Sequence, residues 1–70
     1  MAEMTPRQIA AYHAAMDLRD FAQGRARAAR NAVKQADSQE GRDYQTGAAE
    51  WWEAREKAAQ EIIQKAERQA

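Results

Sequence analysis

Side chains that commonly perform catalysis are scarce in this chain of 70 residues. His13 is the only histidine and there is no cysteine, so thiolate nucleophiles, disulfides and thiolate metal sites are excluded. His13 stands four residues before Asp17, a common pairing on the surface of a helix. The carboxylates lack the Glu-x-x-His spacing of a metal site in a helical bundle, and no glycine-rich phosphate loop is present. The sequence therefore predicts a protein that is not an enzyme, with no catalytic residues, no cofactor and no metal.

Basic residues gather in the first half of the chain. Arg27, Arg30 and Lys34 share one face of a helix and form a candidate phosphate-binding stripe. The whole chain carries 11 basic and 11 acidic residues, so no net field attracts it to nucleic acid. No aromatic residue is interleaved with the stripe to stack on bases. Nucleic-acid association through these three residues is thus the alternative function rather than the leading one.

Acidic residues gather farther along the chain. Residues 18–35 contain five basic residues and one acidic residue, whereas residues 36–56 contain two basic and six acidic residues. If both segments are helical and antiparallel, the two blocks lie side by side and favour that orientation. Glu50, Glu53 and Glu56 then form an acidic face that steers the approach of a basic surface on another protein.

Apolar residues on two sides of the first helical segment predict a protein interface. Ile9, Tyr12 and Met16 project nearly opposite the face that contains Ala11 and Leu18. A helix that is apolar on both sides needs two neighbours. Trp52, adjacent to Trp51 and rotated from it by about 100° on a helix, is a further candidate anchor. We expect Ile9, Tyr12, Met16 and Trp52 to contact a partner.

Two arginines fall within the apolar faces of the predicted helices. Helical projection places Arg25 and Arg55 near the middle of those faces, which is unusual for arginine. Their stems can pack while the guanidinium groups reach solvent or stack on an aromatic ring. A buried polar element that fixes the pairing of the helices is the second interpretation.

Alanine and capping signals predict two helices. The chain contains 18 alanines, the best helix former, and their small side chains let helices approach closely. Thr5-Pro6 is typical of a helix start, and Asp37 followed by Glu40 resembles a capping box. We expect helices over about 6–35 and 39–69, with Gly24 as the position where the first one could bend.

The apolar faces of the two segments predict an antiparallel hairpin. The first face comprises Ala11, Ala14, Ala15, Leu18, Ala22, Ala29, Ala32, Val33 and Ala36, and the second comprises Tyr44, Ala48, Trp51, Ala58, Ala59, Ile62 and Ala66. Residues 1–70 then form a single all-α domain, and we expect two hairpins to dimerise into a four-helix bundle. The alternative is a three-helix chain bent near residues 17–24.

The leading functional hypothesis is a small protein-binding module that self-associates and occludes a surface of a larger partner, as an adaptor or inhibitor. No apolar stretch approaches the roughly 20 residues of a membrane span, and the N-terminal residues do not resemble a signal peptide. A cytoplasmic location is therefore expected. In its alanine-rich, cysteine-free, helical character the chain resembles small accessory proteins of bacteria and phages.

Overall fold

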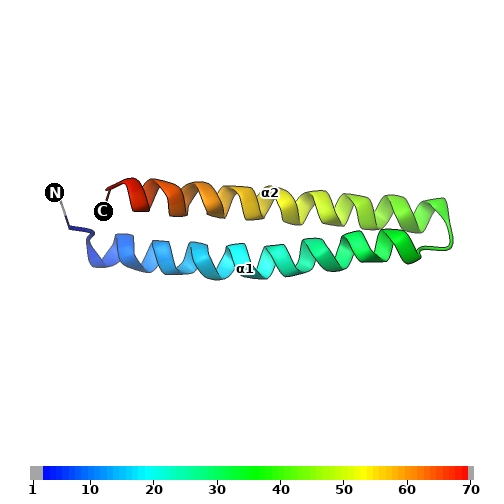
Figure 1. The fold of residues 1–70 in the computed structure, drawn as a ribbon, viewed down its shortest axis with the longest axis horizontal. Helices are drawn as coiled ribbons and strands as arrows, with labels where there is room; N and C mark the ends of the chain where they lie inside the picture. The colour runs from blue at the N-terminus through cyan, green and yellow to red at the C-terminus, as the bar shows by residue number, and fades with distance from the viewer. Residues whose placement is uncertain (1–2, 70) are drawn as a thin grey trace.

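Two long antiparallel helices form a narrow hairpin in the computed structural model, which describes residues 3–69 (Figure 1). Helix α1 spans Pro6–Gln35 and helix α2 spans Gln39–Gln69. The rod measures 54 × 14 × 13 Å, with the connection at one end (Figure 1). The predicted all-α hairpin is confirmed. The alternative with a bend near residues 17–24 is wrong, because α1 runs through Gly24 without a break.

The start of α1 follows the predicted chemistry. The backbone N–H of Gln8 donates to the Thr5 hydroxyl at 3.2 Å, and the Thr5 N–H donates to Oε1 of Gln8 at 2.8 Å. This reciprocal capping box satisfies two backbone donors that the first turn leaves unpaired. Pro6 occupies the first turn, where its missing N–H costs nothing.

Helix α2 begins at Gln39 as predicted, but its capping residue differs from the expectation by one position. Ser38, rather than Asp37, caps the helix, and its hydroxyl accepts a 3.0 Å hydrogen bond from the N–H of Gly41. Glu40 therefore does not complete a capping box with Asp37. Arg42 donates to the carbonyl of Ala36 at 3.3 Å, which satisfies an acceptor at the end of α1. These bonds hold the connection at residues 36–38.

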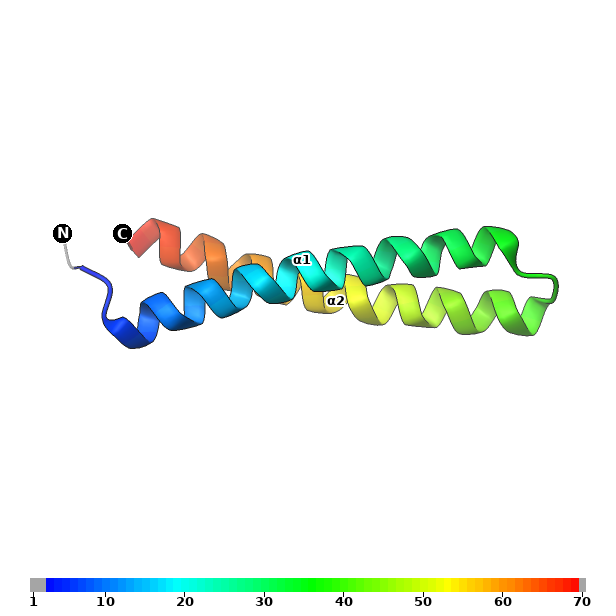
Figure 2. The same cartoon turned by 90° about the horizontal axis from the view of Figure 1, so that it is seen from below.

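The helices meet along a seam at coiled-coil spacing in which alanine is the most frequent residue. Its members alternate steps of three and four residues, and all of them are buried or half-buried. On α1 and its C-cap they are Tyr12, Ala15, Arg19, Ala22, Ala26, Ala29, Val33 and Ala36, and on α2 they are Arg42, Gln45, Ala49, Trp52, Glu56, Ala59, Ile63 and Ala66. Viewed at 90° to Figure 1, the two helices cross midway along the rod (Figure 2). We call this set the seam.

An unbroken row of alanine explains where the seam lies. Ala15, Ala22, Ala29 and Ala36 recur every seven residues, and no other row of α1 repeats alanine so regularly. A methyl-lined row lets the partner backbone come close, which increases dispersion contacts along the full length. Every fully buried core residue within residues 3–69 is alanine except Ile63. Neither helix carries an uncharged apolar stretch of the length that a bilayer crossing requires.

We predict that alanine at two helical glycines stabilises the hairpin. Gly24 and Gly47 are exposed within helices, and a Cβ added at either one meets no atom within 4 Å. Gly24→Ala and Gly47→Ala should each raise the free energy of unfolding by about 1 kcal/mol, because alanine favours the helix by that amount. Urea unfolding measures the change.

Gly41→Ala is the matched comparison. Its added Cβ would lie 3.2 Å from the Ser38 hydroxyl that caps α2, so a smaller gain is expected. A loss of stability in Gly24→Ala would contradict the straight, unobstructed α1 described here.

Candidate protein-binding site

The predicted patch of Ile9, Tyr12 and Met16 is not a separate surface. Tyr12 and Met16 are half-buried and pack against the core cluster of Ala15, Ala59 and Ile63. Tyr12 also donates to the Glu67 carboxylate at 3.4 Å. Only Ile9 of the three is exposed. The placement of this patch opposite the seam is wrong, because the seam lies about one residue farther round α1 than the projection placed it, which turns Tyr12 inward. Contact of these residues with a partner stays a prediction.

Trp52 is also part of the hairpin's own packing. It is half-buried in the seam, and its ring meets Phe21 of α1 at 5.4 Å between centroids, edge to face. Its exposed neighbour Trp51 packs edge to face on it at 4.7 Å. Trp52 therefore lies beneath the exposed surface and supports Trp51. Of the two tryptophans, Trp51 is the more exposed.

Large apolar side chains remain exposed beside the seam on both helices. They are Leu18, Phe21, Tyr44, Trp51 and Ile62, with 39 to 73% of their area exposed. Alanines continue this set at the same alternating spacing. We define the apolar face as Ala11, Ala14, Leu18, Phe21, Arg25, Ala28 and Ala32 of α1 with Tyr44, Ala48, Trp51, Arg55, Ala58 and Ile62 of α2.

Contacts at three heights show that both halves of the apolar face lie on one side of the rod. Ala11 and Ile62 line the same shallow groove near the ends of the chain. Phe21 and Trp51 both pack against Trp52 near the middle. Ala32 and Tyr44 border another groove near the connection. A single apolar strip therefore runs the length of the hairpin.

Arg25 and Arg55 lie on this apolar face and not in the helix interface. The guanidinium carbon of Arg55 lies 3.8 Å from the centroid of the Trp51 ring, and that of Arg25 lies 5.2 Å from the Phe21 centroid. Both arginines are exposed, so their projection into the centre of the contact is wrong. The stacking interpretation is confirmed, with tryptophan and phenylalanine as the rings.

The opposite flank is polar and holds the ion pair that joins the two charge blocks. Arg30 donates to Glu53 through two nitrogens, at 2.7 and 3.0 Å. This hydrogen bond lowers the pKa of the Glu53 carboxyl, desolvation opposes that effect, and the positive charge of Arg30 lowers the pKa further. The same bond raises the pKa of Arg30. Both side chains are about half exposed, so the pair orients the helices more than it stabilises them.

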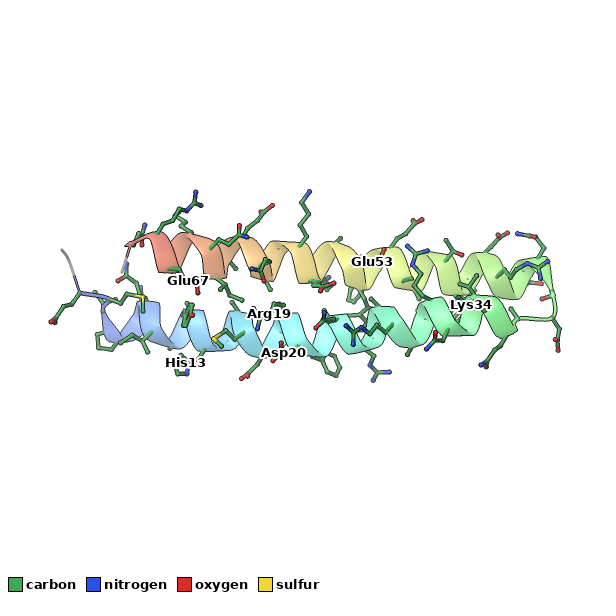
Figure 3. All side chains as sticks on the ribbon, in the orientation of Figure 1. His13, Arg19, Asp20, Lys34, Glu53 and Glu67 are labelled. Carbon is green, nitrogen blue, oxygen red and sulfur yellow. The ribbon has the colours of Figure 1, made fainter. Side chains whose placement is uncertain are left out.

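The predicted acidic and basic faces lie along this flank without forming uniform surfaces. Glu53 is paired, Glu56 belongs to the seam and only Glu50 is exposed. Arg27 and Arg30 line one groove together with Glu53 and Glu56, and Lys34 is exposed near the connection (Figure 3). Opposite charges are therefore interleaved where a one-sign surface was expected.

His13 lies away from the rest of the polar groups. Its side chain projects on the side of α1 remote from α2 (Figure 3), and its ring lies edge to face with the Tyr12 ring, at 6.0 Å between centroids. Within residues 3–69 no three His, Asp or Glu side chains come together as metal ligands.

Arg19 also links the two helices. It donates to Asp20 on its own helix and, across the helices, to Gln60.

No family model, curated protein or solved structure matches this chain. In the sequence, the residues of the apolar face form a second series that alternates steps of three and four, each one residue before a member of the seam. Helical projection treated the two series as one broad face and so did not separate the seam from the exposed apolar face.

We predict that the Arg30–Glu53 pair makes stability depend on pH. A carboxyl whose pKa is lowered on folding stabilises the fold above its unfolded pKa, and that contribution is lost as the pH falls through the folded pKa. Glu53→Gln should therefore melt below the unaltered chain at pH 7 and alike at pH values well below about 4. Thermal melts followed by circular dichroism at several pH values measure this.

Glu61→Gln, at an exposed carboxylate of α2, is the control and should leave the melting temperature nearly unchanged. A Glu53→Gln deficit of the same size at pH 7 and pH 3 would contradict the assignment.

Proposed function

We propose that this chain is a non-enzymatic protein-binding module that self-associates and acts as an adaptor or inhibitor by covering a surface of a larger partner. The observation that supports this most is the apolar face, which exposes aromatic and aliphatic side chains along the length of both helices. Contiguous exposed apolar surface, rather than scattered single residues, marks interaction sites. Interface anchors are enriched in tryptophan, tyrosine and arginine, all of which occur here.

The centre of the apolar face is held in shape before any partner binds. Trp51 rests edge to face on Trp52 and is covered by Arg55, and Phe21 also packs edge to face on Trp52. Side chains fixed by such contacts lose little conformational freedom on binding. The centre of the face therefore has the character of a binding hot spot surrounded by smaller contacts.

The shape of the molecule fits surface occlusion. The grooves along the rod are shallow and open, whereas small-molecule sites are concave and enclose most of the ligand. A straight rod of 54 Å offers one long strip rather than a pocket. A helical groove or a pair of helices on another protein is the shape that such a strip covers.

Nucleic-acid association remains the alternative proposal, through Arg27, Arg30 and Lys34. Arg30 is occupied by Glu53, and Glu56 lines the groove beside Arg27. Interleaved carboxylates repel a phosphate backbone, so no contact among the described residues favours this alternative. Tight binding of DNA or RNA at low salt, lost steeply as salt is raised, would favour it instead.

We predict that a photoreactive group on the apolar face captures protein in cells. p-Benzoylphenylalanine in place of Phe21 should crosslink to protein, because the ring projects from the exposed face. The same group in place of Ala54 is the control, since Ala54 is exposed on the side of α2 away from the seam and the apolar face. Mass spectrometry of the adducts identifies the partner, including a second copy of the chain.

Adducts formed from position 21 but not from position 54 support the proposed function. Absence of any protein adduct at position 21, with the variant folded by circular dichroism, overturns it.

A further inference from the structure

We infer that the apolar face binds one helix of another protein, and that this helix carries a carboxylate midway along its own apolar side, between Arg25 and Arg55. The inference rests on the proposed function and adds the chemistry of the partner. It is carried by the position of these two arginines, which lie side by side in the centre of the apolar face without an acidic neighbour.

Two hydrogen bonds between the helices fix which residues share a height along the rod. Tyr12 donates to Glu67, and Arg19 donates to Gln60. From the first pair to the second, α1 advances seven residues and α2 goes back seven, as antiparallel helices of equal rise require. Six residues farther along α1, position 25 is level with position 54 of α2. Arg55 is the next residue, so the two arginines lie within about 1.5 Å of the same height.

Aromatic rings join the two arginines into one cluster. Arg25 lies over the Phe21 ring and Arg55 over the Trp51 ring, and both rings pack edge to face on Trp52. Each arginine follows its ring by four residues, the spacing at which a side chain directed towards the N-terminus covers the preceding turn. Stacking holds each guanidinium over its ring and leaves N–H groups at the guanidinium edge for an acceptor.

Both arginines belong to the row of their helix that lies nearer the seam. The inner rows, with seven residues between members, are Ala11, Leu18, Arg25 and Ala32 of α1 and Ala48, Arg55 and Ile62 of α2, and the remaining members of the apolar face form the outer rows. Exposure agrees with this division, because Ala32 and Ala48 are half-buried whereas Ala28 and Ala58 of the outer rows are exposed. The two guanidinium groups therefore start from the middle of the strip and not from its edges.

The hairpin places no carboxylate where it could pair with either arginine. The positions three and four residues before and after Arg25 and Arg55 hold only phenylalanine, tryptophan and alanine. Among residues 3–69, neither arginine takes part in an ion pair, whereas Arg30 on the polar flank is paired with Glu53. Two positive charges side by side repel each other, and a carboxylate between them replaces that repulsion with charge-assisted hydrogen bonds.

The surroundings of the arginines favour a protein helix as the occupant. Leu18 and Ile62 are exposed in the same inner rows. Nucleic acid is bound through phosphate contacts from basic and polar side chains, which leaves these two residues without a role. Helices that lie on a bilayer carry their basic residues on the polar side, whereas here the arginines interrupt the apolar side. A helix laid lengthwise on both α1 and α2 covers the two aliphatic side chains and presents its carboxylate to the arginines.

A synthetic helical peptide tests the inference. The probe has about 20 residues, and so about 30 Å of helix, with leucine along one side, alanine and glutamine elsewhere, and one glutamate midway along the leucine side. The comparison peptide has glutamine in place of that glutamate. Binding is followed by the fluorescence of Trp51 and Trp52, the only tryptophans of the chain. The glutamate peptide should bind roughly tenfold more tightly at low salt, and added salt should reduce the difference.

Paired variants of the chain assign this preference to the two arginines. Arg25→Gln combined with Arg55→Gln should make the two peptides bind alike, because the charged donors are gone while the stems remain. Arg27→Gln combined with Lys57→Gln is the matched control. It removes the same charge from exposed positions outside the apolar face and should keep the roughly tenfold preference. Circular dichroism verifies that both variants are folded.

Three results overturn the inference. The first is equal binding of the two peptides by the unaltered chain, and the second is a preference that persists without Arg25 and Arg55. The third is failure of both peptides to bind, whether the chain then sediments as a dimer or binds vesicles of anionic phospholipid. Protein adducts from position 21 would in each case leave the proposed function standing, with a partner of different chemistry.

Discussion

The close approach of two helix backbones along a row of alanine methyls is the constraint on which the rest of this structure depends. Ala15, Ala22, Ala29 and Ala36 present no side chain beyond Cβ, so α2 can lie directly against α1 for its whole length. A narrow gap of this kind excludes large residues from most of the seam. The large side chains are therefore displaced to the flank, even though they are the more hydrophobic ones.

This displacement links the packing of the hairpin to its proposed function. Each helix has an apolar stripe wider than one neighbour can cover, and the seam uses one edge of it. The other edge carries Phe21 and Trp51, with Arg25 and Arg55 stacked on their rings. An exposed apolar surface of this kind lowers solubility unless a partner covers it. The arginines reduce that effect because their charged groups lie over the aromatic rings. The polar flank with the Arg30–Glu53 pair faces water.

Local signals in the sequence were sufficient to predict the two helices, but not to predict which face of each helix contacts the other. The helix-start signal of Thr5-Pro6 and the abundance of alanine predicted the helices, because those signals act within a few residues. Helical projection misplaced the contact face because it counts every apolar residue equally. It does not test whether a side chain fits between two closely spaced helices. The seven-residue alanine row was the available signal for the seam. Arg25 and Arg55 were projected inward for the same reason, although a guanidinium without a carboxylate is costly to bury.

The seam itself is tested most directly by nuclear Overhauser contacts between the methyl groups of Ala15 and Ile63. A strong cross-peak is expected, since both side chains are nearly fully buried in one cluster. Mixing labelled with unlabelled chains restricts the signal to contacts within one molecule. A folded, helical chain that lacks this intramolecular cross-peak would contradict the seam and, with it, the exposure of the apolar face.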